Sequence, residues 1–62
     1  KIEEIERKMI GQFYFDIVIE ELNNEKMIIG IIRNKKTIIK PDKSLIIEEN
    51  DFLISLITKN TN

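Results

Sequence analysis

The stretch KMIIGIIRNKKTIIKP, residues 26–41, decides which fold this sequence can adopt. It holds a nearly continuous apolar run at 26–33, the dipeptide Asn34-Lys35 and a shorter β-branched run at 36–40. β-Branched side chains suit a pleated strand, and Asn tolerates the positive φ that a tight hairpin turn requires. We therefore predict a strand, a tight turn and a returning strand that ends at Pro41, because proline has no N–H to donate to a neighbouring strand.

The first of these strands, 26–33, lacks the alternation of polar and apolar residues. A strand that is apolar on both faces is typical of the middle of a sheet that is covered on both sides. Gly30 lies inside the run, and a glycine at such a position indicates a bulge or the close approach of another backbone. We predict a central strand that carries an irregularity of this kind at Gly30.

Downstream of the hairpin the sequence predicts one more strand, at 52–58, where apolar residues are nearly continuous. Between the hairpin and this strand, 44–48 is expected to be a short extended or turn segment, and 49–51 a turn. The polar residues 59–62 are expected to fray.

The first 22 residues leave two assignments open. In 1–12 the apolar residues recur at i, i+3 and i+7, which predicts an amphipathic linker helix, with a short strand at 2–5 as the alternative. In 13–22 β-forming residues alternate with period 2, but helical spacing fits the same apolar positions. Composition favours a strand in this second segment.

The composition predicts a single small α+β domain that depends on a partner. The chain has 62 residues, 10 basic and 11 acidic side chains, and neither cysteine nor histidine. A domain of this size buries a modest share of its surface, and it has no disulfide or thiolate metal site to stabilise it. We expect a mostly antiparallel sheet with one or two helices, whose surplus apolar face is covered in a homodimer. The balanced charge speaks against contact with nucleic acid.

No group of residues predicts catalysis, so we expect that the chain is not an enzyme. Ser44 and Ser55 have no histidine to activate them, and we expect neither a metal nor a cofactor. The acidic residues Glu48, Glu49 and Asp51 are interpreted as a solvated turn rather than a cation or acid–base site.

The basic hairpin, residues 33–36, allows two interpretations. Arginine offers a fork that matches phosphate, and two copies at a dimer interface would suit a symmetric anion. Alternatively, the charges keep a sheet edge soluble.

Residues 28–42 together with 44–54 resemble the TrkA C-terminal domain, also called the RCK C-terminal domain, the regulator of potassium conductance. The shared pattern is an apolar strand that ends in a basic residue, a tight turn, a second strand that ends in Pro, a polar stretch, a turn before Asp and a final apolar strand. This chain has Asn50 where the family usually has Gly, and Asn also adopts the left-handed conformation. The resemblance implies a helix within 13–22 and a regulatory domain over 13–62, with 1–12 as a linker helix or first element.

The resemblance also implies a function. Domains of this family form cytoplasmic homodimers beside potassium channels and other ion transporters, and in several bacterial members cyclic di-AMP binds at the dimer interface. Ligand binding would then bias one arrangement of the dimer. The ligand-binding residues carried over to this chain are Ile29, Ile31, Arg33, Asn34 and Pro41. The alternatives are a ligand-free dimerisation module and the effector domain of a transcription regulator.

Overall fold

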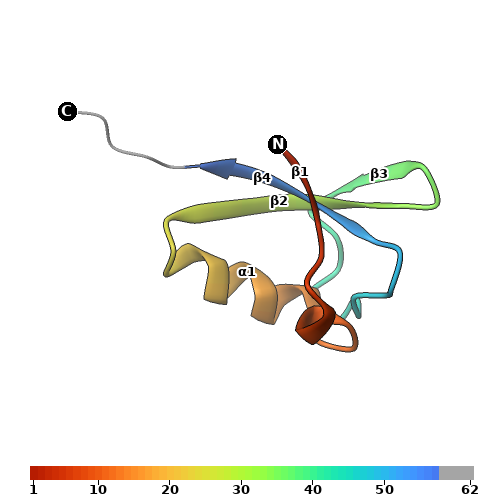
Figure 1. Ribbon diagram of the computed structural model, residues 1–62, viewed down its shortest axis with the longest axis horizontal. Coiled ribbons are helices and arrows are strands. Elements are labelled where there is room, and N and C mark those ends of the chain that lie inside the picture. Colours follow the sequence, from red (N-terminus) through yellow and green to blue (C-terminus); the bar gives the residue numbers. More distant parts are fainter. Residues whose placement is uncertain (58–62) are drawn as a thin grey trace.

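Four antiparallel strands and one α-helix make up residues 1–57, the part of the chain that the computed structural model describes (Figure 1). In chain order the elements are β1 (Ile2–Glu4), the 3₁₀ turn η1 (Arg7–Met9), α1 (Tyr14–Leu22), β2 (Lys26–Arg33), β3 (Lys36–Ile39) and β4 (Phe52–Ile57). The sheet has the order β1-β4-β2-β3, and α1 lies against one of its faces. The predicted α+β class with a mostly antiparallel sheet is confirmed. Thr58 and the tail at 59–62 lie outside the described residues, so their predictions stay predictions.

The β2–β3 hairpin has the form that its sequence predicts. Arg33 pairs with Lys36 at the turn, and the ladder runs back to Gly30 opposite Ile39. The two turn residues, Asn34-Lys35, have φ angles of 53° and 65°. Positive φ at both positions is the requirement of the two-residue turn whose twist matches that of the flanking strands. The hairpin is therefore dictated by local turn chemistry.

Gly30 combines both irregularities that its position predicts. The register of β2 against β4 shifts between Ile28 and Gly30, as in a β-bulge. A Cβ atom added to Gly30 would lie 2.5 Å from the carbonyl oxygen of Ile38, on the neighbouring strand. Only glycine fits at this point of the sheet, where the ladder between β2 and β3 also ends.

Residues 14–22 form a helix, so the strand that composition favours at 13–22 is wrong and the helix implied by the family resemblance is confirmed. Tyr14, Ile17 and Val18 share one side of α1 and pack against the sheet. A helical stripe of this kind covers the inner face of the sheet, which a fifth strand would leave open. Tertiary packing thus overrides the β propensity of the segment.

The helix predicted across 1–12 is also wrong, and its alternative, a short strand, is confirmed. β1 pairs with β4, and this brings Glu3 onto the inner face opposite Leu53. The Glu3 carboxylate accepts hydrogen bonds from Ser55 Oγ at 2.6 Å and Lys26 Nζ at 2.8 Å. These partners come from β4 and β2, so the hydrogen bonds that stabilise an extended conformation at this edge exist only once the sheet has assembled.

The core lies between α1 and the inner face of the sheet. It consists of Met9, Tyr14, Ile17, Ile28, Ile31, Ile47 and Leu53. Strand alternation places a second apolar set on the opposite, outer face, where the exposed fractions range from 39% to 61%. This outer apolar face comprises Ile2, Met27, Ile39, Phe52 and Leu56. The prediction that β2 is covered on both faces is therefore wrong for the single chain, although β2 is central. No helix within residues 1–57 is long and apolar enough to cross a bilayer.

Candidate ligand cavity

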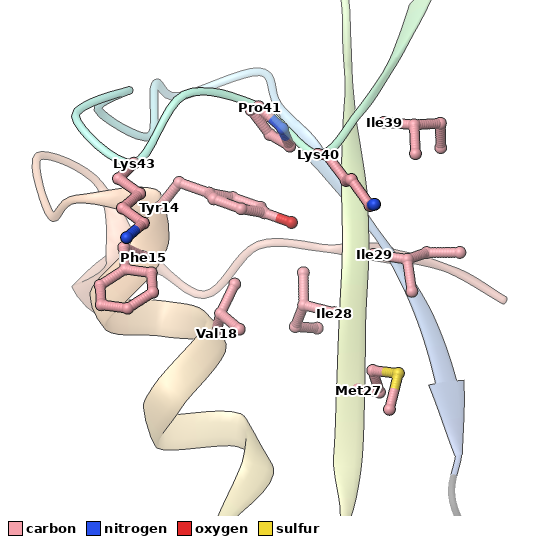
Figure 2. Close-up of a pocket in the computed structure, with 10 residues that line it drawn as sticks. All are labelled: Tyr14, Phe15, Val18, Met27, Ile28, Ile29, Ile39, Lys40, Pro41 and Lys43. Carbon is pink, nitrogen blue, oxygen red and sulfur yellow. The ribbon is translucent and has the colours of Figure 1, made fainter.

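An open apolar cavity of about 550 Å³ lies where the first half of β2 faces the start of α1 (Figure 2). The segment that follows β3 closes its third side. The lining residues are Tyr14, Phe15 and Val18 from α1, Met27, Ile28 and Ile29 from β2, and Ile39, Lys40, Pro41 and Lys43 from β3 and the segment after it. Cavities of this size and character are typical of sites for small organic ligands.

The cavity exists because β2 is longer than its partner β3. The β2–β3 ladder stops at Gly30, so the described residues provide no β3 partner for 26–29. After the ladder, Lys40 N donates to Ile29 O at 3.2 Å, and the chain turns away with Lys40 at a φ of 53°. A left-handed lysine is strained by roughly 1–2 kcal/mol. This conformation directs the chain so that Pro41 lies across the top of the cavity.

Tyr14 is fixed at the helix side of the cavity by backbone contacts. Its N–H donates to Leu45 O at 2.7 Å, and next to it Phe13 forms a β-bridge with Ile46. The side chain is only 6% exposed, yet its hydroxyl points away from α1 into the cavity, toward β2 (Figure 2). Among residues 1–57 no group is hydrogen-bonded to this hydroxyl, and it is open to the cavity, because no fully buried side-chain oxygen or nitrogen there lacks a partner. Burial raises the pKa of Tyr14 above its ordinary value of 10.0, so the hydroxyl stays protonated.

Two lysines give the rim of the cavity its charge. Lys40 and Lys43 line it, and no acidic side chain among residues 1–57 does. Lys43 Nζ lies 5.1 Å from the centre of the Phe15 ring, at the helix side of the cavity. Asp42, between the lysines in sequence, accepts hydrogen bonds from Ser44 N and Ser44 Oγ, which lower its pKa. The rim thus favours an anionic group.

The structure separates the five residues predicted to bind a ligand. Ile29 and Pro41 both line the cavity. Ile31 is fully buried in the core, and Asn34 lies in the exposed hairpin turn at the other end of β2. Arg33, beside the turn, points to the loop before β4. The prediction therefore locates one wall of the cavity but does not describe a single site within one chain.

Arg33 is bound to Asp51 through two parallel hydrogen bonds. Its Nε donates to Oδ1 at 2.8 Å and its Nη2 to Oδ2 at 2.7 Å, while Nη2 also donates to Ile46 O at 2.8 Å. Asp51 is 3% exposed, so the interpretation of a solvated acidic turn is wrong for this residue. Burial raises the pKa of Asp51, but the hydrogen bonds from Arg33 and Glu48 N, with the Arg33 charge, outweigh it and hold the pKa below 3.8. The pair fastens the loop to β2.

Sequence reasoning missed Tyr14, Val18 and Lys43 as cavity residues. The i, i+4 spacing of Tyr14 and Val18 identifies a shared helix face, but only once 14–22 is known to be helical. The turn at Lys40 brings Lys43 to the cavity, and no pattern in the sequence predicts this turn. Within residues 1–57 no cluster of three or more acidic side chains is arranged to hold a metal ion.

Comparison of the chain with protein-family models, with curated proteins and with solved structures found no match. The resemblance of 28–54 to the TrkA C-terminal domain therefore stays a prediction.

Proposed function

We propose that this chain is a non-catalytic, ligand-sensing regulatory domain that works as a homodimer in the cytoplasm and controls a potassium channel or another ion transporter. The observation that carries the proposal is the open apolar cavity beside the free half of β2, rimmed by Lys40 and Lys43. It offers contact area for a flat organic body and charge for an anion. The family resemblance supplies the transport context.

Cyclic di-AMP is the ligand that we propose first. An adenine ring finds apolar contacts at Ile29 and Pro41, two of the residues that the resemblance carries over. The phosphates find cations at the lysine rim. Arg33 plays no direct part in this version, because Asp51 already occupies its guanidinium.

The homodimer is supported by the outer apolar face. Five large apolar side chains of this face are 39% or more exposed, and they come from all four strands. A second copy that packs its own outer face on the first would remove both faces from water at once, at roughly 25 cal/mol per Å² of apolar area. The cavity reaches this face at Met27 and Ile39, so dimerisation and ligand binding share two residues.

Calorimetric titration of the chain with cyclic di-AMP tests the ligand. We expect saturable binding that Lys43→Gln weakens, since Lys43 lines the cavity. Lys36→Gln is the matched control, because Lys36 is exposed on β3 and does not line the cavity. Absence of heat at high micromolar nucleotide would rule out cyclic di-AMP.

Light scattering tests the dimer and its surface. We expect twice the mass of the chain, and a monomer for Leu56→Lys, which places a charge in the outer apolar face. Ile19→Lys is the control, because Ile19 is comparably exposed, at 48% against 52% for Leu56, but lies on α1. A monomeric native chain, or a dimer that only Ile19→Lys disrupts, contradicts the assignment.

A dimerisation module without a ligand is the second candidate, and one observation favours it. The arginine that the family resemblance assigns to the ligand is neutralised within the chain by Asp51. This candidate predicts a dimer by light scattering together with no response to any anion in the calorimeter.

A further inference from the structure

We propose that Tyr14 is the specificity-determining residue of the cavity, and that its hydroxyl donates a hydrogen bond to a ring nitrogen of a flat aromatic anion. The anionic group of that ligand lies at the lysine rim. This inference rests on the proposed role of the cavity as a ligand site, but it assigns a residue and a ligand chemistry that do not depend on cyclic di-AMP.

The first argument is the direction of the hydroxyl. Tyr14 is 6% exposed and its hydroxyl points into the cavity, yet no group in residues 1–57 is hydrogen-bonded to it. No fully buried side-chain oxygen or nitrogen in this part of the chain lacks a partner, so this hydroxyl is open to the cavity and available to whatever fills it. The side chains of Val18, Ile28 and Ile29 border the same space, and none of them can accept a hydrogen bond. A ligand in the cavity is therefore placed to accept from Tyr14.

The second argument is that the hydroxyl is held in place before any ligand binds. The Tyr14 backbone is fixed to Leu45 O, and its ring belongs to the core beside Ile17. A donor that needs no reorganisation discriminates strongly between ligands, because a ligand without an acceptor leaves it desolvated and unpaired. A protonated phenol is a donor first, and burial of Tyr14 keeps it protonated.

The third argument is the arrangement of apolar walls and a basic rim along the cavity. Apolar walls on α1 and β2 fit the faces of a flat ring, and the cavity volume of about 550 Å³ admits more than one ring. Lys40 and Lys43 supply positive charge at the rim, and none of the lining residues that the structure describes is acidic. One molecule with an aromatic body, a ring nitrogen and an acidic group satisfies all of these surfaces. Nucleotides and heteroaromatic carboxylates both have this chemistry.

Isosteric probes test the proposal. The panel contains naphthalene-2-carboxylate, a set of quinoline carboxylates that differ in the position of nitrogen, AMP and cyclic di-AMP. The two bicyclic acids have the same shape and charge, so they differ only in the acceptor. We expect the native chain to prefer at least one quinoline carboxylate over naphthalene-2-carboxylate by about fivefold, the size of one net hydrogen bond. Tyr14→Phe should abolish this preference and still bind naphthalene-2-carboxylate.

A second measurement keeps the test valid if Tyr14→Phe fails to fold. Tyr14 is the sole tyrosine of the chain, so incorporation of 3-fluorotyrosine gives a single ¹⁹F resonance in the native sequence. Quinoline carboxylates should shift this resonance further than naphthalene-2-carboxylate does. The nucleotide arms show whether the natural source is a nucleotide or a simpler acid.

The outcomes separate this inference from the proposed function. Equal binding of quinoline and naphthalene acids by the native chain overturns the role of Tyr14, as does cyclic di-AMP binding that Tyr14→Phe leaves unchanged, and both leave the cavity as a ligand site. Tyr14-dependent binding of quinoline acids without any response to cyclic di-AMP supports the inference and rejects the nucleotide. No binding by any probe, with an unmoved ¹⁹F resonance, overturns both.

Discussion

The two ends of β2 differ in how their polar groups are paired. At its carboxyl end, the tight turn closes the hairpin, and Arg33 is paired with a buried carboxylate and a backbone carbonyl. At its amino end, no β3 residue among 1–57 pairs with 26–28, and the Tyr14 hydroxyl points into the cavity without a hydrogen-bond partner in this part of the chain. The closed end has the charged residues that suggest binding, but the open end has the space and the unpaired donor. Function is better sought where polar groups are left unpaired than where charges are dense.

The largest effect should come from removing the carboxylate at the closed end. Asp51→Ala leaves Arg33 half-buried without its partner, and the loop before β4 loses its anchor. We expect a loss of about 3 kcal/mol in the free energy of unfolding, measured by urea denaturation at fixed protein concentration. Glu49→Ala, at an exposed turn position, should cost less than 0.5 kcal/mol or so. A loss for Asp51→Ala as small as that of the control would mean that the pair does not hold this end together.

The junction between the two ends should be the next most sensitive position. Gly30→Ala forces a methyl group against the Ile38 carbonyl at 2.5 Å, and backbone on both sides has to move. We expect a cost of about 2 kcal/mol and faster hydrogen exchange of the Lys40 amide, which bonds to Ile29 O. Gly11→Ala is the comparison, because Gly11 has free space around it but a φ of 88°. It should cost about 1 kcal/mol and leave the exchange of Lys40 unchanged.

Two strained lysines, one at each end, provide a matched pair. Lys35 and Lys40 have φ angles of 65° and 53°. Replacement by glycine relieves roughly 1–2 kcal/mol of strain and adds 0.4–1 kcal/mol of unfolded-state entropy, so each variant should gain about 0.5–1 kcal/mol in stability. Only Lys40→Gly should weaken binding of the anionic probes, because only Lys40 lines the cavity. Equal weakening by both would indicate a diffuse charge effect.

The smallest effect concerns pH. The pKa of Asp51 is lower in the folded chain than its ordinary value of 3.8, so the stability that its ionisation contributes is fully present above that pH. As pH falls below about 3.8 toward the folded-state value, this contribution is lost. Denaturant titrations between neutral pH and pH 3 should show a shallower fall for Asp51→Asn than for the native chain. Glu3→Gln should also flatten the curve, since the Lys26 and Ser55 hydrogen bonds lower the pKa of Glu3.

Most of the sheet follows from short-range rules, whereas the candidate site does not. The turn at Asn34-Lys35, the bulge at Gly30 and the end of β3 before Pro41 are each determined by the φ range or the missing atoms of one residue. Ile29 and Pro41 both line the cavity because they flank this hairpin. Tyr14 and Lys43 could not be predicted, because their positions depend on the path of the chain after Lys40 and on a helix that composition disfavours.

The β2–β3 hairpin, the final strand and the excess of apolar surface follow from local or additive properties of the sequence: turn geometry, β-branched side chains and an unbalanced apolar count. Four features depend instead on the folded chain: the helix at 14–22, the strand at 2–4, the pairing of Arg33 with Asp51 and the position of Tyr14 at the cavity. Each of these depends on which partner is nearby after folding. A segment with two nearly equal local conformations takes the one that buries its side chains and satisfies its polar groups against the rest of the chain.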